Sequence, residues 1–568
     1  MTLSRQNSLA RDLLLLTLFL GVLYLAMTWT RPLAHPDEGR YVEIPREMVE
    51  SGDWITPRLN GVLYFYKPPL FYWAEAIAIS VGGFNLFALR FWPMAFSLIG
   101  ILGTYLFARR QFDRITGLMS AGVLGTSLLY FGLGQIILLD MAVSVFMALS
   151  LFLFYAALHE EEKSKRRWLF WAFYVSVALA VLSKGLMGLL IPGAVIFLWF
   201  LIFNQWKKLR DLNLITGSLL FLIVALPWHI LVGIRNPEWF DFYIVQEHFL
   251  RYLTDVSERS KPFWFFLVIM PAGLFPWAFF LPQAIKQGFA GGWKARHQHL
   301  DMWFLAVWAL FILFFFSISK SKLIPYILPT YPAMAVIVGY FLALAWKSPE
   351  RFRIRWSFLA FAILSLLGAI ALPVLAFARA HKVDPGVMTP VVAAMILLAA
   401  LAVVFYWLFK RNKIREGLIG IFIGVSLFLL VFNPLASKFQ RPSTKPLADF
   451  LKPHLLAEDE IYTFQDYYQD LPVYLERPIG VAENLPNEQS YGVEWEPEQK
   501  VRYPGQVDVA ARWDGPTRIF GMAKDDHLKQ FQHHVRLAGD TPIYLWLATD
   551  RFILFSNRPP PYQTDESS

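Results

Sequence analysis

Long apolar segments dominate this chain and restrict the folds that it can adopt. Thirteen segments are candidate membrane spans, and they begin near residues 12, 91, 115, 138, 168, 186, 213, 263, 301, 323, 356, 389 and 416. A helix needs about 20 apolar residues to cross roughly 30 Å of hydrocarbon, and it satisfies its own backbone hydrogen bonds there. The pattern therefore predicts a mainly α-helical, polytopic membrane protein.

The composition supports this class and excludes several chemistries. Of the 568 residues, 56% are hydrophobic and only 17% are charged, which is unusual for a soluble protein. The 21 Trp, 23 Tyr and 51 Phe residues fit lipid-facing helices with aromatic belts at the interfaces. There is no cysteine, so disulfides, thiol nucleophiles and cysteine metal ligands are excluded.

The positive charges indicate an orientation in the membrane. The net charge is +9, and Lys and Arg gather in alternate short loops, for example 109–114, 163–167 and 410–415. Such loops are typical of the cytoplasmic side, so we predict a cytoplasmic N-terminus and no nucleic-acid partner. An odd number of spans then places the C-terminus outside.

The pattern along the chain indicates two domains. We predict a transmembrane domain over 1–436, with long outer loops at 31–90 and 233–262, and a small α/β domain over 437–568. In the first loop, 38–51 and 69–81 are expected to form short helices along the membrane surface. In the C-terminal domain we expect helices over 445–454 and 525–534 and strands over 460–464, 472–475, 517–521 and 542–548.

Acidic residues at the edges of the apolar segments are the first candidates for chemistry. Asp37 and Glu38 follow the first span, and Asp140 opens the fourth. A carboxylate at such an edge is costly unless it is paired or hydrated, which makes it a functional candidate. Capping of the following helix is the alternative for Asp37 and Glu38. The predicted topology places Asp37 and Asp140 on the outer side, where they can converge on one site.

Basic residues on the same predicted side suit an anionic lipid. Lys184 stands in a tight outer turn, where a lysine that reaches toward water is the alternative. His248 and Arg251 would share a helical face and suit phosphate, because arginine presents a planar fork of donors; a structural histidine is the alternative. Lys320 and Lys322 lie in a further outer turn, where their charge suits a lipid headgroup.

Six motifs occur in an order that resembles a known family. They are His-Pro-Asp-Glu-Gly-Arg-Tyr (35–41), Gly-Asp-Trp-Ile-Thr-Pro-Arg-Leu-Asn-Gly (52–61), Tyr-Lys-Pro-Pro-Leu-Phe-Tyr-Trp (66–73), Leu-Ser-Lys-Gly (182–185), Glu-His-Phe-Leu-Arg-Tyr (247–252) and Ser-Lys-Ser-Lys-Leu-Ile-Pro-Tyr-Ile-Leu-Pro (319–329). Over about residues 10–435 the chain resembles the bacterial aminoarabinose lipid A transferase family (ArnT-like), within the protein mannosyltransferase-like GT-C membrane glycosyltransferases.

The resemblance implies a fold, a reaction and a set of residues. It implies a GT-C enzyme of the bacterial inner membrane, with its active site and C-terminal domain in the periplasm. That enzyme transfers a sugar, best 4-amino-4-deoxy-L-arabinose, from undecaprenyl phosphate to lipid A phosphate. We expect inversion, because no second carboxylate is placed as an obvious covalent nucleophile. It implies that Asp37 and Asp140 are catalytic and that Arg40 and Lys67 bind the donor phosphate. We add Lys184, His248 and Arg251 for the donor phosphate, and Glu38, Tyr41, Arg58, Tyr64, Lys320, Lys322 and Tyr326 for substrate binding.

One departure from the family pattern keeps alternatives open. The family commonly has an acid directly before the lysine of the Lys-Pro motif, and this chain has Tyr66. The sequence requires no cofactor, and a divalent metal bound by Glu38, His248 and another loop acid is left open. The alternatives for function are a polyprenyl-phosphate-sugar-dependent transferase acting on protein or another glycan, and a transporter or flippase of lipid-linked sugars. Against the latter, we find no inverted repeat.

Overall fold

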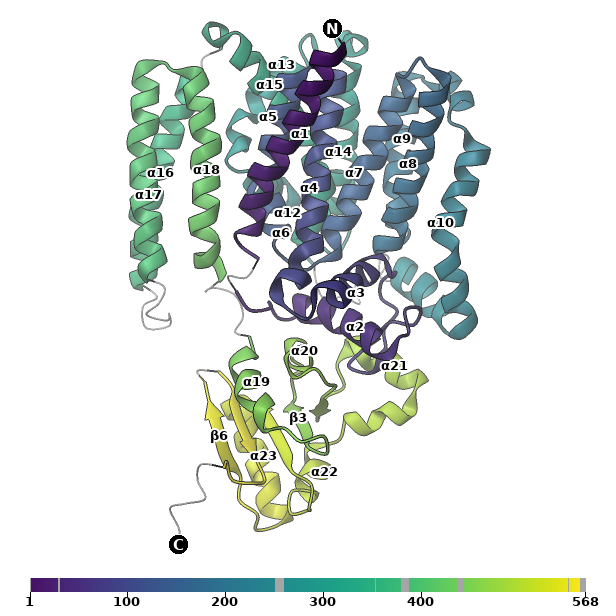
Figure 1. Ribbon diagram of the computed structural model, residues 1–568, viewed down its shortest axis with the longest axis vertical. Coiled ribbons are helices and arrows are strands. Elements are labelled where there is room, and N and C mark those ends of the chain that lie inside the picture. The colour runs from purple at the N-terminus through teal and green to yellow at the C-terminus, as the bar shows by residue number, and fades with distance from the viewer. Residues whose placement is uncertain are drawn as a thin grey trace. The chain divides into compact units, whose positions relative to one another are not determined.

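The computed structural model shows a mainly helical chain with a small sheet near its C-terminus (Figure 1). It describes residues 2–28, 31–250, 260–352, 354–378, 388–437, 443–549 and 551–561. The chain divides into two compact units. Unit 1 comprises residues 1–31, 90–230 and 244–439, and unit 2 comprises residues 32–89, 231–243 and 440–568. Unit 2 thus combines the first long loop with the C-terminal residues, a grouping that the sequence analysis did not anticipate.

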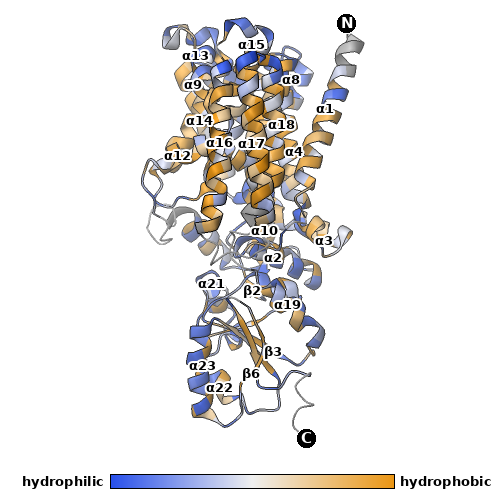
Figure 2. Cartoon of the chain, turned by 90° about the vertical axis from the view of Figure 1, so that its left-hand side faces the viewer, coloured by the Kyte–Doolittle hydropathy of each residue, from blue (hydrophilic) through white to orange (hydrophobic). Residues whose placement is uncertain are grey.

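The regular secondary structure of unit 1 is helical over its described residues, apart from one isolated β-bridge between Ser260 and Ser321. Its elements are α1 (Thr2–Leu25), α4 (Leu86–Gln111), α5 (Arg114–Gly125), α6 (Leu128–Leu133), α7 (Leu139–Leu158), α8 (Lys163–Lys184), α9 (Met187–Phe203), η1 (Trp206–Asp211), α10 (Leu214–Arg235), η2 (Asp241–Leu250), α12 (Phe265–Gly273), η3 (Trp277–Phe280), α13 (Leu281–Gly288), η4 (Gly292–Gln298), α14 (Leu300–Ile318), η5 (Ile324–Thr330), α15 (Tyr331–Lys347), η6 (Pro349–Arg351), α16 (Arg355–Ala378), α17 (Met388–Arg411) and α18 (Ile414–Ser437). Figure 2 shows how hydrophobic residues cover helices such as α14, α16 and α17.

The described residues contain fewer full spans than the thirteen predicted. Ten helices are long and apolar enough to cross a membrane, or eleven if the bent pair Phe265–Gly273 and Trp277–Gly288 forms one span. Helix α9 has 17 residues and reaches about 26 Å at 1.5 Å per residue, and α5 has 12 residues and reaches about 18 Å. Both fall short of the roughly 30 Å hydrocarbon core. A helix that is buried among other helices has the same apolar pattern as one that crosses the membrane, so the sequence pattern did not separate the two.

A buried acid joins three helices of unit 1. The Asp12 carboxylate of α1 accepts hydrogen bonds from Tyr105 Oη at 2.8 Å and from the guanidiniums of Arg109 and Arg114 at 2.6–3.0 Å. Breaking a buried ion pair leaves an uncompensated charge, so this cluster favours a single arrangement of α1, α4 and α5.

Unit 2 contains the first-loop helices and the C-terminal α/β fold. Its elements are α2 (Asp37–Ser51), β1 (Arg58–Leu59), β2 (Val62–Leu63), α3 (Leu70–Gly82), α19 (Lys445–Leu451), η9 (Lys452–His454), β3 (Glu460–Phe464), α20 (Asp470–Leu475), β4 (Gly480–Ala482), α21 (Asn487–Trp495), η10 (Pro497–Arg502), α22 (Gln506–Ala511), β5 (Ile519–Ala523), α23 (Asp525–Ala538), β6 (Tyr544–Ala548) and β7 (Ile553–Ser556).

The first-loop helices lie where the sequence predicted them. Helix α2 ends at Gly52, which adopts a left-handed φ of 71°, and α3 begins after two prolines and ends at Gly83, with φ 77°. Glycine tolerates this backbone conformation without steric cost, and proline suits the first turn of a helix. The local sequence therefore accounts for where α2 ends and for where α3 begins and ends.

A hairpin connects the first loop to the C-terminal residues of unit 2. Strands β1 and β2 pair antiparallel around Asn60 and Gly61, whose φ values of 58° and 78° are those of a type I′ turn. The Asn60 side chain donates to the Ile479 carbonyl at 2.9 Å and accepts from the Ile479 N–H at 2.8 Å. The Asn60 carbonyl accepts from Arg502 at 2.7 Å. One asparagine thus sets the turn and binds two distant segments.

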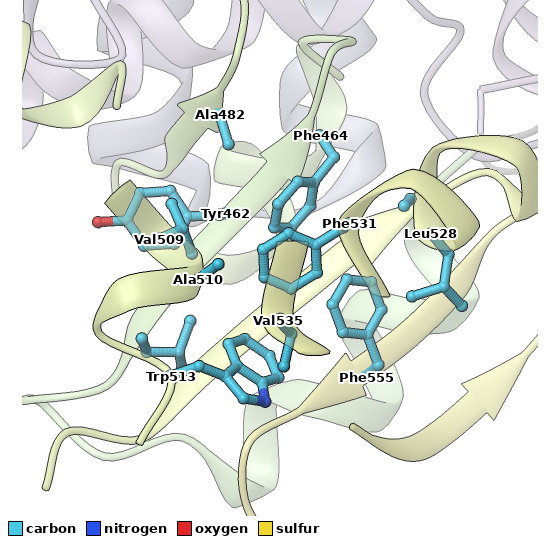
Figure 3. Packing of buried hydrophobic residues seen from close by; sticks show 12 residues of the cluster. Tyr462, Phe464, Ala482, Val509, Ala510, Trp513, Leu528, Phe531, Val535 and Phe555 are labelled. Atoms are coloured by element: carbon cyan, nitrogen blue, oxygen red, sulfur yellow. The ribbon is translucent and has the colours of Figure 1, made fainter. Parts of the chain in front are cut away.

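The C-terminal sheet mixes parallel and antiparallel strands. The strand order is β4-β3-β5-β7-β6, in which β3 pairs parallel with both β4 and β5, while β7 pairs antiparallel with β5 and β6. Phe464 of β3, Phe531 of α23, Phe555 of β7 and Trp513 form the centre of its core (Figure 3). The rings of Phe464 and Phe531 lie 4.3 Å apart.

The C-terminal predictions are partly confirmed and partly wrong. Strand β3 and helix α23 begin where predicted, and β6 lies within the predicted 542–548. The predicted strand 472–475 is wrong, because these residues belong to α20. A short apolar run is ambiguous between strand and helix, and Pro472 fits the first turn of a helix. Strands β4 and β7 and helices α21 and α22 were not predicted from the sequence.

Candidate active site

An arginine between two acids marks the centre of the candidate site in unit 2. Arg40 lies in the second turn of α2, and its Nη1 is 3.1 Å from Asp37 Oδ1 on the same helix. Its Nε is 2.5 Å from Glu488 Oε2 of α21. Burial acts to lower the pKa of Arg40, but the nearby carboxylates of Glu488 and Asp37 more than offset this effect and raise the pKa, so the guanidinium stays charged.

Asp37 remains accessible although it is ion-paired. Its side chain is 52% exposed, whereas that of Arg40 is 16% exposed. The pair uses Oδ1 of Asp37, which leaves Oδ2 for a ligand. Arg40 thus orients the carboxylate without covering it.

Glycine at position 39 allows the close packing that brings these acids together. A Cβ at Gly39 would lie 2.5 Å from the Asp470 nitrogen and from the Gln469 carbonyl carbon, at the start of α20. Gln469 in turn donates through Nε2 to Glu488 Oε1 at 2.5 Å. The glycine of the Asp-Glu-Gly-Arg motif therefore permits α2 to approach the C-terminal segment, and that approach places Glu488 against Arg40.

Glu38 is buried and serves the start of α2. Its Oε2 accepts the Ala34 N–H at 2.6 Å. The nearby Glu75 of α3 is also fully buried, and neither of its carboxylate oxygens has a hydrogen-bond partner among the described residues. Burial and the Glu38 carboxylate raise the pKa of Glu75 well above its usual range. These contacts give Glu38 a structural role in addition to the predicted role in substrate binding.

Aromatic side chains form the surroundings of Arg40. Tyr41 stacks on Tyr72 with ring centroids 6.2 Å apart, and Tyr64 lies 4.8 Å from Tyr66. Tyr64 is buried and Lys67, three residues on, is half-buried. Burial raises the pKa of Tyr64, so its hydroxyl stays protonated beside the arginine. The predicted residues Arg40, Tyr41, Tyr64 and Lys67 thus all belong to unit 2.

Two other first-loop residues contact the C-terminal segment. Arg58 donates to both carboxylate oxygens of Glu496 at 2.7 Å, and to the Gly61 carbonyl at 3.0 Å. Tyr66 donates to the Asn487 carbonyl at 3.2 Å. Arg58 therefore holds the hairpin, a role that the sequence analysis did not anticipate. Tyr66 places a phenol directly before Lys67.

In unit 1 the second predicted catalytic acid is paired with a predicted cation. Asp140 lies in the first turn of α7, and Lys184, the last residue of α8, donates to its Oδ1. An acid at a helix N-terminus and a base at a helix C-terminus are both favoured by the helix dipoles. The Lys184 ammonium also lies 4.9 Å from the ring centroid of Tyr326. Asp140, Lys184 and Tyr326 therefore form one cluster.

The two lysines of the following turn differ in their surroundings. Lys320 is exposed, whereas Lys322 is only 5% exposed and donates to the Ser319 carbonyl. Burial lowers the pKa of Lys322. A buried ammonium with a backbone partner supports the turn itself, so only Lys320 retains the surroundings expected of a headgroup ligand.

Two predicted donor-phosphate residues fall wholly or partly outside the described part of the chain. Arg251 lies outside the described residues, and His248 lies in η2 with its side chain outside the described part. The convergence of Asp37 with Asp140 stays a prediction. Over the ranges that the structure describes, no three or more His, Cys, Asp or Glu residues are grouped as metal ligands. Glu488 is the functional candidate that sequence reasoning missed, because it sits on a short polar helix with no motif.

Comparison with known proteins places this geometry in a class. The model of the dolichyl-phosphate-mannose-protein mannosyltransferase family matches residues 9–243. The crystal structure of ArnT from Cupriavidus metallidurans bound to undecaprenyl phosphate superimposes with a TM-score of 0.81 at 26% identity, covering 96% of this chain and 98% of that one. The protein is therefore a multi-pass membrane glycosyltransferase of the GT-C fold, which uses a polyprenyl-phosphate-linked sugar donor.

Two relatives define the family. The undecaprenyl phosphate-α-4-amino-4-deoxy-L-arabinose arabinosyl transferase of Pectobacterium carotovorum is 30% identical over 465 residues, which is 80% of this chain and 81% of that protein. The transferase of the same description from Enterobacter sp. is 25% identical over 96% of both chains. The chain belongs to the undecaprenyl phosphate-aminoarabinose arabinosyl transferase family.

Proposed function

We propose that this protein transfers 4-amino-4-deoxy-L-arabinose from undecaprenyl phosphate to a phosphate of lipid A, on the periplasmic face of the bacterial inner membrane. The observation that carries the proposal is the Asp37–Arg40–Glu488 cluster, in which Asp37 and Arg40 belong to the motif that the family resemblance assigns to catalysis and donor binding. The name of the relatives supplies the sugar and its carrier.

The reaction is a single displacement. An oxygen of the acceptor phosphate attacks the anomeric carbon, the bond from that carbon to the donor phosphate oxygen breaks, and undecaprenyl phosphate leaves with the electron pair. A phosphate acceptor is already anionic near neutral pH, so a strong base is not needed. Asp37 then orients the acceptor or stabilises the positive charge that develops at the sugar carbon. One displacement gives inversion at that carbon.

Basic residues neutralise the charge that grows on the leaving phosphate. Lys67 is half-buried, and a charge held in a partly dry site interacts more strongly than in water. Arg40 is already bound by Asp37 and Glu488, so we assign it the positioning of Asp37 in addition to the predicted phosphate contact. In unit 1, Lys184 balances Asp140 and is the corresponding candidate. The proposal includes no resident metal.

Mass spectrometry of lipid A tests the proposal. A bacterial strain that lacks its own aminoarabinose transferase would express this chain or its Asp37→Asn variant. We expect the mass increment of one aminopentose per modified phosphate with the wild type and none with the variant. Unmodified lipid A in the strain that expresses the wild-type chain would contradict the proposed acceptor. Both strains must contain equal amounts of the expressed protein.

A second candidate differs in the sugar or the acceptor. Tyr66, which donates to the Asn487 carbonyl, stands where the family commonly has an acid. This residue changes the chemistry next to Lys67. The alternative is therefore the transfer of another polyprenyl-linked sugar, with protein or another glycan as the acceptor. Surface glycans and glycoproteins from the same strains would then carry the new mass instead of lipid A.

A further inference from the structure

A polar pocket lies in the C-terminal domain, at the ends of three strands. The cavity has a volume of about 480 Å³, and its lining residues are Gln465, Asp466, Glu483, Asn484, Lys524 and His527. Gln465 and Asp466 directly follow β3, Glu483 and Asn484 follow β4, and Lys524 follows β5. His527 lies in the first turn of α23. The pocket therefore collects residues from the carboxyl ends of all three parallel strands.

The strand order explains why a pocket forms at this place. The chain passes from β3 to β4 on one side of β3 and then returns to β5 on the other side. Connections that leave a parallel sheet in opposite directions open a crevice at the carboxyl ends of the strands, where α/β proteins bind ligands. The pocket therefore lies at the place in this sheet where a crevice is expected.

The pocket has both donors and acceptors. Between the carboxyl ends of β5 and β3, Lys524 Nζ donates to Asp466 Oδ2 at 2.5 Å. The backbone of Gln506 donates to Glu483 Oε2 at 2.9 Å, which leaves Oε1 for a ligand. Asn484 donates to the Gln465 carbonyl at 2.9 Å and keeps its amide oxygen as an acceptor. These side chains are held by partners while their remaining polar atoms line the cavity.

His527 adds a polar atom with no partner. Its Nδ1 is inaccessible to solvent and has no hydrogen-bond partner among the described residues. A buried imidazole nitrogen without a partner is costly unless a water or a ligand satisfies it. His527 is a lining residue of the pocket, but this nitrogen is itself closed to solvent, so the ligand contacts come from the other lining groups.

The charges of the lining select among ligand classes. Asp466 and Glu483 are both carboxylates, and Lys524 is paired with the first of them. Neither a phosphate nor a sulfate is favoured, because Glu483 would repel it. A bound metal cation is disfavoured because Asp466 is already paired with Lys524, which leaves Glu483 as the one remaining carboxylate of the lining. A ligand with several hydroxyls matches the set, because each hydroxyl donates to a carboxylate or amide oxygen and accepts from an amide or an ammonium.

We propose that this pocket, lined by residues 465–466, 483–484, 524 and 527, binds a neutral or amino sugar. It is a second carbohydrate site, separate from the residues assigned to transfer. Glu483 supplies the strongest contact, since a carboxylate that accepts from a sugar hydroxyl forms a charge-assisted hydrogen bond.

Saturation-transfer NMR of the full chain in lipid nanodiscs tests the site. The probes are methyl β-D-glucopyranoside, D-glucosamine and D-glucosamine 6-phosphate. We expect the first two to bind the wild type and the phosphorylated sugar to bind more weakly. Glu483→Gln keeps the shape of the side chain and should raise the dissociation constant roughly tenfold, as expected for one charge-assisted hydrogen bond. Glu498→Gln, an exposed acid outside the pocket, should change nothing.

Two outcomes would overturn the site. Identical titrations of the wild type and Glu483→Gln would place sugar binding elsewhere, and tighter binding of the phosphorylated sugar would indicate an anion site. If Glu483→Gln lowers the melting temperature relative to Glu498→Gln, Asn484→Ala replaces it, because it leaves the contact between Glu483 and Gln506 in place. Unchanged binding in that variant also overturns the proposal. The assay needs no transfer reaction, so its outcome is independent of the proposed function.

Discussion

At the scale of single residues, Asp37 is both paired with Arg40 and exposed to solvent. We expect Asp37→Asn to lower the transfer rate by at least about a hundredfold, the usual cost of removing one group that stabilises developing charge. Its melting temperature should stay within a few degrees, because an exposed side chain contributes little to folding. The measurement is turnover by the purified protein in parallel with thermal unfolding.

The matched control for that experiment is Asp449→Asn. Asp449 is also exposed and ion-paired, with Lys445, but it lies in α19. Near-normal turnover of Asp37→Asn, or an equal loss in the Asp449 variant, would remove Asp37 from the catalytic role.

Lys67 is the residue that we assign to the donor phosphate. Lys67→Ala should cost roughly 3 kcal/mol of transition-state stabilisation, or about a hundredfold in rate. Lys67→Arg should retain a small residual rate, since a guanidinium is larger and differently hydrated than an ammonium. The loss should be the same with every acceptor, because the donor is common to all of them. A variant that slows one acceptor and spares another would place Lys67 in the acceptor site.

At the scale of elements, the β1–β2 hairpin depends on Asn60. Asn60→Ala removes both hydrogen bonds to Ile479 and leaves two buried backbone groups without partners, which should destabilise the protein by roughly 2–4 kcal/mol. Thermal unfolding in detergent measures the effect. Asn204→Ala is the control, because Asn204 also has a positive φ, of 51°, but is an exposed helix end. Equal losses in the two variants would attribute the effect to the turn conformation alone.

The turn before η5 separates two lysines that look alike in sequence. Lys322→Gln should lower stability by about 1.5–3 kcal/mol, because it removes a charged donor to a buried carbonyl. Lys320→Gln should leave the melting temperature unchanged and weaken apparent affinity for the lipid substrate, with a loss that shrinks as salt rises. A stable Lys322 variant with salt-dependent affinity would restore the original interpretation, in which both lysines bind headgroups.

At the scale of the whole molecule, the proposal contains no resident metal. Extensive dialysis against EDTA should therefore leave the transfer rate unchanged when the buffer is otherwise identical. The described residues offer no group of three or more His, Cys, Asp or Glu side chains that could hold a metal, and the residue directly before Lys67 is Tyr66 and not an acid. Loss of activity that Mg²⁺, Mn²⁺ or Zn²⁺ restores would show that a metal site is assembled, with His248 as its first candidate ligand.

The amino-acid sequence by itself determined what depends on near neighbours. The long apolar runs predicted the spanning helices, and Gly52, the paired prolines and Gly83 delimited α2 and α3, because helix ends and membrane spans are encoded over a few turns. Motif order was sufficient for the family. The predicted acids and bases of the first loop also lie together in unit 2, since they share one short segment.

Only the tertiary structure decided what depends on distant contacts. It brought Glu488 to Arg40, Glu496 to Arg58 and Ile479 to Asn60. It also shows that Lys322 is buried, that residues 470–475 form a helix, and that α5 and α9 are shorter than a full membrane span. Such contacts join residues hundreds of positions apart, and no local periodicity records which partner a side chain will meet. The physical reason is that burial and charge pairing are properties of the packed chain, whereas helix and turn preferences belong to the local sequence.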